Sequence, residues 1–163
     1  EPGVSAHIAA ICRRTAGLGL ELMVEPGRSI VGPAGALVSR VLYRKSTGSK
    51  EFIVLDAAMN DLIRPALYKA HHEIVPLRQS AAPSITADIV GPVCESGDFF
   101  AQGREVANVL PGDYNALLTA GAFGFTLSSN YNSRPRAAEG LVDDNQWRIV
   151  RRRETLEDVI RGE

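Results

Sequence analysis

Residues 36–56 read ALVSRVLYRKSTGSKEFIVLD and predict a β-hairpin. Residues 36–43 and 51–56 are rich in β-branched and apolar side chains, which favour strands. The polar residues 46–49, STGS, lie between these two runs and are typical of the loop that joins antiparallel strands. Similar short runs recur along the rest of the chain, so the hairpin indicates a mainly β structure.

Further strands are expected after this hairpin, each bounded by turn residues. Pro111-Gly112-Asp113 predicts a turn before one of them, and Asp143-Asp144-Asn145 predicts the loop of a second hairpin. Thr155 is placed to cap a short terminal helix that runs through Ile160. Many short strands separated by turns are typical of a β-sandwich or barrel. The expected strands are 72–77, 85–93, 115–123, 136–142 and 146–152.

The first part of the chain has a different pattern. Apolar residues recur at helical spacing over residues 4–16, and residues 20–24 form a short apolar run that suits a buried strand. A helix followed by a strand is typical of an α/β domain, so we place a domain boundary near Gly32-Pro33. Residues 1–32 are expected to be the tail of an α/β domain, and residues 33–163 an all-β domain. Because the chain opens with Glu1 rather than methionine, we interpret it as part of something longer.

Composition narrows the classes of function. The chain has 163 residues, 45% hydrophobic residues and a formal net charge of −1, which predicts a folded protein with little attraction for nucleic acid. It contains no secretory signal and no apolar run long enough to cross a membrane, so we expect a cytoplasmic protein. The two cysteines and three histidines never fall at the spacing of zinc ligands, so we expect no metal site.

A thiol and a carboxylate stand side by side in Cys94-Glu95-Ser96-Gly97-Asp98. Neighbouring side chains on an extended strand point to opposite faces, so this pair shares one site only if the backbone turns. Gly91, Pro92 and Gly97 supply such a turn. The alternative is that Cys94 is an inert, buried side chain. Against it, burying the adjacent carboxylate without a cationic partner would be costly, and a substrate ammonium group could be that partner.

Two other motifs pair an arginine with a further polar group. Glu25-Pro26-Gly27-Arg28 follows the expected strand 20–24, where ligands collect in α/β barrels, although the same residues could form an ordinary turn with a surface ion pair. Arg64 and Tyr68 are four residues apart and would share one face of a helical turn, where arginine can bind a carboxylate with two hydrogen bonds. A solvated arginine beside a half-buried tyrosine is the alternative.

Residues 56–60, DAAMN, are too small and polar to continue a strand and favour a functional loop. Residues 121–124, GAFG, are expected to end a strand and lead into residues 128–132, SSNYN. The hydroxyl and amide groups of this last run could line a pocket or could belong to a solvated loop, and the sequence leaves both open.

Four segments, taken in order, carry a resemblance to a known family. They are EPGRSIVGPAG (25–35), VLDAAMNDLIRPALY (54–68), ADIVGPVCESGDF (87–99) and AGAFGFTLSSNYNSRPR (120–136). They closely resemble the carboxy-terminal part of diaminopimelate decarboxylases, which are pyridoxal 5'-phosphate enzymes with an alanine-racemase-like barrel followed by a β-domain. The resemblance implies a mainly β chain with some α structure, in which the tail of a (β/α)8 barrel precedes a β-barrel or sandwich domain.

The resemblance also implies an activity and a partner. The full-length enzyme would convert meso-2,6-diaminopimelate to L-lysine in lysine biosynthesis, and the cofactor would accept the electrons left by the departing carbon dioxide. It would work as a homodimer with shared active sites, because in this family Cys94 and Glu95 would reach into the site of the neighbouring subunit.

Individual roles follow residue by residue from the resemblance. Glu25 would pair with the pyridine nitrogen of the cofactor, and Gly27 and Arg28 would lie by its phosphate, with Arg28 also reaching the substrate. Pro26 belongs to the same cofactor motif, and Phe123 stands at a position that contacts both cofactor and substrate.

The remaining matched positions would serve the substrate. Arg64 and Tyr68 match residues that hold a substrate carboxylate, and Glu95 matches the residue that reads the distal amino-acid end. Cys94 matches the proton donor to the α carbon, a role that suits a thiol with an ordinary pKa of about 8.5 because it is mostly protonated near neutrality.

Two departures from the family pattern bear on activity. The Schiff-base lysine of the family lies on an early barrel strand that has no counterpart here, and Lys45, Lys50 and Lys69 do not replace it. We therefore expect no decarboxylation by this chain alone. Phe123 stands where the family usually has tyrosine, and losing that hydroxyl group costs on the order of 1–3 kcal/mol if its partner stays buried and unpaired.

Two alternatives stay open from the sequence. A related decarboxylase acting on ornithine or arginine would share the cofactor, but Arg64, Tyr68 and Glu95 favour a substrate with a second carboxylate. A non-catalytic β-domain that serves as a dimerisation or binding module would explain the missing lysine and Phe123.

Overall fold

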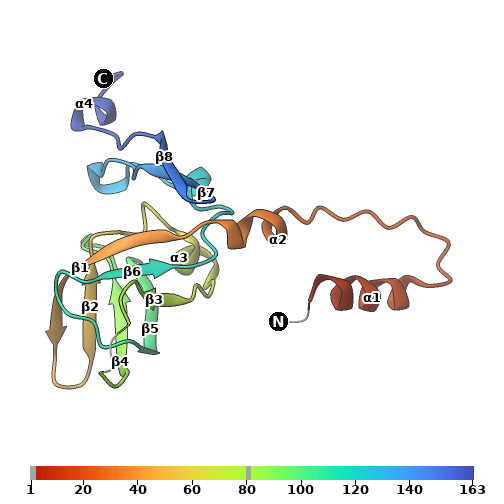
Figure 1. The fold of residues 1–163 in the computed structure, drawn as a ribbon, viewed down its shortest axis with the longest axis horizontal. Helices are drawn as coiled ribbons and strands as arrows, with labels where there is room; N and C mark the ends of the chain where they lie inside the picture. The colour runs from red at the N-terminus through yellow and green to blue at the C-terminus, as the bar shows by residue number, and fades with distance from the viewer. Residues whose placement is uncertain (1–2, 80–81) are drawn as a thin grey trace.

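The computed structural model describes residues 3–79 and 82–163, and it is mainly β, as predicted (Figure 1). Residues 1–2 of the predicted α/β tail and residues 80–81 of the predicted β-domain lie outside the described residues. A six-stranded sheet in the order β3-β6-β1-β2-β4-β5 forms the body, and β7 and β8 form a separate two-stranded sheet.

The predicted hairpin of residues 36–56 is confirmed and lies in the middle of the large sheet. β1 (Leu37–Ser46) pairs antiparallel with β2 (Glu51–Leu55), and Ser46 lies opposite Glu51 at the loop. Ile53 and Leu55 are fully buried, because β2 has neighbours on both sides, β1 and the parallel strand β4 (Ile85–Val90).

The other strands are shorter than the sequence indicates, because the backbone turns earlier. The 115–123 prediction is confirmed only as β6 (Tyr114–Leu117), since Thr119 and Phe123 have φ values of 60° and 57°, which a strand does not accommodate. β4 ends at Val90, just before Pro92. The 72–77 and 136–142 predictions become β3 (Ile74–Pro76) and β7 (Glu139–Asp143), and the last hairpin strand is β8 (Gln146–Arg151).

One strand and several helical turns carry little sequence signal. β5 (Phe99–Val106) is missed by the sequence pattern, because its residues FFAQGREV mix apolar and charged side chains without strict alternation. The other elements without a clear pattern are α2 (Gly27–Val31) and the 3-10 turns η1 (Gly32–Ala34), η2 (Phe125–Leu127) and η3 (Tyr131–Ser133).

The helix predicted over residues 4–16 is confirmed as α1 (Val4–Thr15), and the terminal helix as α4 (Leu156–Val159), whose Thr155 cap completes a capping box with Asp158. The strand predicted over residues 20–24 is wrong. These residues are exposed, and the segment runs extended between α1 and α2 without pairing to any described strand (Figure 1). A strand needs a hydrogen-bonding neighbour, and the described residues offer none there.

The core lies within the large sheet and the loops that close it. Its largest fully buried side chains include Phe100, Ile53, Leu55, Leu62, Ile89 and Leu117. Leu62 lies in the segment between β2 and the short helix α3 (Arg64–Tyr68), so the core fixes the start of α3. None of the helices in the described part of the chain is long and apolar enough to span a membrane.

Candidate functional site

Most of the predicted site residues fall into two groups. The arginine cluster is defined by the predicted residues Arg28, Arg64, Tyr68 and Phe123 together with His72, and it lies where α2, α3 and the turn after β6 meet. The Cys94 loop, residues 91–98, connects β4 to β5. Each group is held by contacts that the sequence alone does not reveal.

Arg64 is buried against two aromatic rings. It begins α3, its exposed fraction is 9%, and its guanidinium carbon lies 5.6 Å from the ring centroid of Tyr68 and 5.7 Å from that of Phe123. The alternative of a solvated arginine is therefore wrong, and Tyr68 is exposed rather than half-buried. Arg64 Nε is buried without a hydrogen-bond partner. A planar cation that is held between two rings and has an unpaired buried N–H group is suited to bind a carboxylate or phosphate oxygen.

His72 is a member of this cluster that sequence reasoning missed. Its Nδ1 donates a hydrogen bond to the carbonyl of Leu118 at 2.8 Å, while its Nε2 is buried without a partner. Burial lowers the pKa of His72, and the positive charges of Arg64 and Arg28 lower it further. In the sequence analysis the histidines are weighed only as metal ligands. No motif or spacing in the sequence indicates that His72 lies near the two arginines.

Arg28 lies in the first turn of α2, which begins at Gly27, directly after Glu25 and Pro26. The carbonyl of Pro26 accepts hydrogen bonds from Ser29 Oγ at 2.6 Å and from the Ile30 amide at 3.3 Å, which turns the chain into the helix. Glu25 and Arg28 are both exposed, and no ion pair joins them in the described part of the chain. Both side chains thus remain available to a ligand.

Phe123 reaches the cluster from a tight turn after β6. A Cβ on Gly121 would lie 2.0 Å from the carbonyl oxygen of Val31, so this turn packs directly against the end of α2. The Gly121 amide donates to the carbonyl of Gly32 at 3.0 Å. The structure thereby brings the 25–35 and 120–136 segments together, which the sequence does not show.

Asp98 organises the Cys94 loop. Its buried carboxylate accepts hydrogen bonds from the Val93 amide at 2.8 Å and the Met59 amide at 2.7 Å. Burial raises the pKa of Asp98, and these two hydrogen bonds oppose that rise. The Asp98 amide also donates to the carbonyl of Glu95 at 3.0 Å, which closes the predicted turn.

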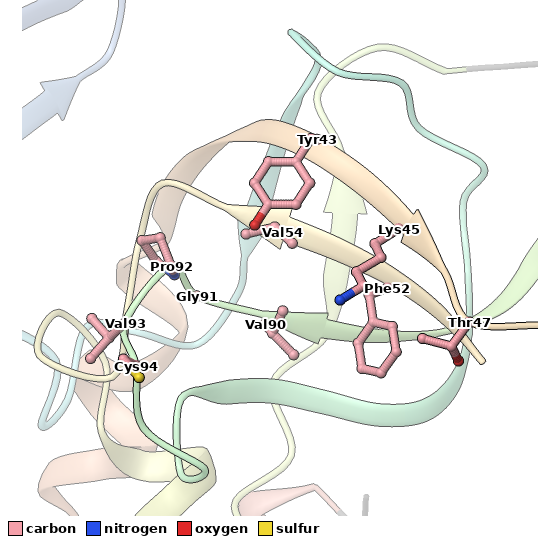
Figure 2. Close-up of a pocket in the computed structure, with 10 residues that line it drawn as sticks. All are labelled: Tyr43, Lys45, Thr47, Phe52, Val54, Val90, Gly91, Pro92, Val93 and Cys94. Atoms are coloured by element: carbon pink, nitrogen blue, oxygen red, sulfur yellow. The ribbon is translucent and has the colours of Figure 1, made fainter. Parts of the chain in front are cut away.

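Cys94 is exposed on this turn, so the interpretation as a buried, inert thiol is wrong. Cys94 lines a groove of about 340 Å³. Figure 2 shows its sulfur at one end of the row of lining residues and Thr47 at the other end. Strands β1, β2 and β4 line the groove, mostly with apolar side chains that include Tyr43, Phe52 and Val90. The thiol can therefore be reached from outside the chain.

Glu95 is exposed too, so the predicted cost of burying its carboxylate does not arise. The Gly97 amide donates to Glu95 Oε1 at 3.1 Å, and the Tyr131 hydroxyl donates to Glu95 Oε2 at 3.1 Å. These hydrogen bonds lower the pKa of Glu95. A fixed, ionised carboxylate at the surface is suited to a cationic group.

The two groups are not in direct contact within the described part of the chain. In the part that the structure describes, no hydrogen bond, ion pair or ring contact joins Arg64 to Cys94 or Glu95. The arginine cluster can hold an anion, and the Cys94 loop presents an exposed thiol and a carboxylate.

The arrangement matches known proteins. A family model described as "Pyridoxal-dependent decarboxylase, C-terminal sheet domain" matches residues 28–121. A curated diaminopimelate decarboxylase from Pseudomonas aeruginosa is 51% identical over 162 residues, which is 99% of this chain and 39% of that protein. One from Aquifex aeolicus is 50% identical over 140 residues, 86% of this chain and 33% of that protein.

A solved structure agrees with this match. The crystal structure of diaminopimelate decarboxylase from Helicobacter pylori complexed with L-lysine superposes with a TM-score of 0.82 at 40% identity, covering 97% of this chain and 39% of that one. The chain thus spans about two fifths or less of the length of these relatives. It belongs to the pyridoxal-dependent decarboxylases and contains their C-terminal sheet domain.

Proposed function

We propose that this chain is the carboxy-terminal portion of a diaminopimelate decarboxylase, which removes one carboxylate of meso-2,6-diaminopimelate and releases L-lysine. The observation that carries the proposal is the arginine cluster: Arg64, buried between Tyr68 and Phe123, is a ready receptor for a carboxylate. The relatives named diaminopimelate decarboxylase, at about 50% identity, support the same reaction.

The residues present fit a pyridoxal 5'-phosphate cofactor. Arg28 supplies a cation for its phosphate beside Gly27, Glu25 is free to hold a pyridine nitrogen protonated, and the ring of Phe123 lies next to Arg64. The bound cofactor would accept the electron pair left on the α carbon as carbon dioxide departs. The lysine that would hold it covalently is expected in the portion of the relatives that this chain does not cover.

The substrate would be held at its two ends by different groups. Arg64 and Tyr68 would bind a carboxylate, with Arg28 adding a second positive charge that already acts on His72. Glu95 would accept the distal ammonium group, since its carboxylate is ionised and exposed. Cys94 would deliver the proton that replaces carbon dioxide on the α carbon, because its thiol is accessible.

We infer that the active protein is a homodimer in the cytoplasm. The exposure of Cys94 and Glu95 at the surface of this chain supports a site completed by the Cys94 loop of a second subunit. Residues 1–32 would then be the last part of a (β/α)8 barrel, in which residues 20–24 find the strand neighbours that the described residues do not offer.

A chimera tests the proposal. In it, this chain replaces the matching carboxy-terminal segment of the Pseudomonas aeruginosa relative, which supplies the remaining part of the protein. We expect the chimera to bind pyridoxal 5'-phosphate, with its characteristic absorbance, and to release carbon dioxide from meso-diaminopimelate. A folded chimera with neither property would overturn the proposal.

The same chimera separates the two alternatives. Faster turnover of ornithine or arginine than of meso-diaminopimelate would favour a related decarboxylase. A folded dimer that binds no cofactor would favour a non-catalytic module. An initiating methionine codon directly upstream of Glu1 in the gene would also support the non-catalytic module.

A further inference from the structure

Tyr131 contacts the residue that we expect to read the distal end of the substrate. Its hydroxyl lies 3.1 Å from Glu95 Oε2, although the two residues are 36 positions apart in the sequence. The hydrogen bond to Glu95 and the charge of that carboxylate raise the pKa of Tyr131, so its hydroxyl keeps its proton and acts as the donor. Nothing in the sequence motifs singles out Tyr131, which stands only as part of a polar run.

The Glu95 side of this contact is rigidly supported. The Gly97 amide holds the other carboxylate oxygen at 3.1 Å, and the buried Asp98 carboxylate fixes the turn through the Val93 and Met59 amides. A Cβ on Gly97 would already lie 3.5 Å from the methyl carbon of Met59, so the turn is packed as well as hydrogen-bonded.

The segment that carries Tyr131 is held by Asn60, the residue next to Met59 in the chain. Asn60, which follows Met59 and is buried, accepts from the Ser129 amide through its carbonyl at 3.0 Å and donates through Nδ2 to the Ser129 carbonyl at 3.3 Å. Arg134 Nε donates to Asn60 Oδ1 at 2.9 Å. Tyr131 therefore lies on a segment anchored on both sides to Asn60.

The consecutive residues Met59 and Asn60 thus fix the positions of two loops relative to each other. Met59 fixes the loop that carries Glu95, and Asn60 fixes the loop that carries Tyr131. An incidental surface contact between two long side chains needs no such support from a buried segment. The shared anchor explains why a carboxylate and a phenol on distant loops meet with defined geometry.

We propose that Tyr131 is a positioning residue that fixes the Glu95 carboxylate as the receptor for the distal ammonium group of the substrate. This inference rests on the proposed function. Gly97 and Tyr131 each donate to one carboxylate oxygen, which orients the group and leaves its remaining lone pairs for the ammonium hydrogens. Tyr131 itself moves no proton to the α carbon, so its effect falls on binding.

The test is Tyr131→Phe in the chimera, with KM and kcat measured on meso-diaminopimelate. Phenylalanine keeps the ring and removes the donor, so KM should rise about three- to tenfold while kcat stays within about twofold. Tyr114→Phe is the matched control, because Tyr114 is an exposed tyrosine on β6 whose position in the sheet is set by its backbone. It should leave KM unchanged.

Two further measurements separate positioning from a general structural effect. Inhibition by 2-aminopimelate, which lacks the distal amino group, should be unchanged by Tyr131→Phe. In the Glu95→Gln background, Tyr131→Phe should add less than about a twofold rise in KM, because the two side chains act through one carboxylate.

The outcomes distinguish the two proposals. If the unsubstituted chimera shows no activity on meso-diaminopimelate, the proposed function fails. If it is active but Tyr131→Phe leaves KM unchanged, or weakens 2-aminopimelate inhibition as much as it raises the KM for meso-diaminopimelate, the positioning role of Tyr131 is overturned.

Discussion

The carboxylate of Asp98 fills the space beside the α carbon of Gly91, so that a Cβ at residue 91 would lie 2.3 Å from Asp98 Oδ2. The same carboxylate accepts hydrogen bonds from the Val93 and Met59 amides, and these bonds shape the Cys94 loop. Glycine at residue 91 is thus required by a close approach, and the loop that carries the candidate proton donor depends on it.

Gly91→Ala should destabilise the protein, because the added methyl group displaces a buried carboxylate from its two amide donors. Losing such hydrogen bonds costs about 1–3 kcal/mol. We expect the thermal midpoint of the chimera to fall by several degrees in calorimetry. Gly140→Ala is the control, since among the described residues a Cβ there meets only the Arg148 carbonyl, at 3.8 Å. Equal midpoints for both variants would contradict the role of Asp98 as a clamp.

Arg64→Lys should weaken substrate binding although the charge is kept. An ammonium group cannot reproduce the planar, two-pronged donor set of a guanidinium held between the rings of Tyr68 and Phe123. We expect KM for meso-diaminopimelate to rise roughly tenfold in steady-state assays. Arg148→Lys, on the exposed strand β8, should leave KM unchanged. An unaltered KM for Arg64→Lys would remove Arg64 from the substrate site.

Cys94→Ala should lower kcat far more than it changes KM, because a group that delivers a proton acts on the chemical step. Losing a general acid lowers the rate by about 10²- to 10⁴-fold. The matched control is Cys12→Ala, which removes the other exposed cysteine from α1, outside the site. Both variants should be assayed for release of L-lysine in the chimera, and similar kcat values for the two would exclude a catalytic Cys94.

Phe123→Tyr should tighten cofactor binding. The ring of Phe123 is 49% exposed and faces Arg64, so an added hydroxyl group has room and would supply the donor that we expect at this position from the family resemblance. The dissociation constant of pyridoxal 5'-phosphate, measured by fluorescence titration of the chimera, should fall about threefold to tenfold. Phe125→Tyr, whose ring instead lies under Arg151, should not change it. Weaker binding by Phe123→Tyr would contradict the prediction.

His72 should make the protein less stable as the pH falls. Its pKa is lowered in the folded state, so the unfolded chain takes up a proton first as the pH drops below about 6.5. The contribution of His72 is therefore fully present above a pH of about 6.5 and is lost as the pH falls toward its lower folded-state pKa. The slope of the thermal midpoint against pH is measured by comparing midpoints at about one pH unit above 6.5 and about half a unit below 6.5.

His72→Asn should reduce that slope, because an amide can donate to the Leu118 carbonyl without taking up a proton. His71→Asn is the neighbouring control, because it removes an exposed imidazole next to the buried one. A slope that is the same in His72→Asn and in the unsubstituted chimera would show that His72 does not titrate on unfolding.

The hairpin of residues 36–56 and the helix of residues 4–16 could be predicted because each depends on a local pattern of apolar residues and turns. The candidate residues Arg64, Tyr68, Cys94 and Glu95 could be named because they stand in short motifs. A strand at residues 20–24 could not be decided in this way, since an apolar run becomes a strand only beside another strand.

Local sequence patterns thus predict a mainly β chain, its central hairpin and most of the groups that carry chemistry. The folding of the chain brings Phe123 to face Arg64, places His72 where the charges of two arginines lower its pKa, and brings Tyr131 to Glu95. Local patterns do not predict the Phe123–Arg64 and Tyr131–Glu95 contacts, because the partners stand on separate segments that meet only in the folded protein. The Tyr131–Glu95 contact, for example, depends on the buried anchors Asp98 and Asn60, whose hydrogen bonds have no periodic signature in the sequence.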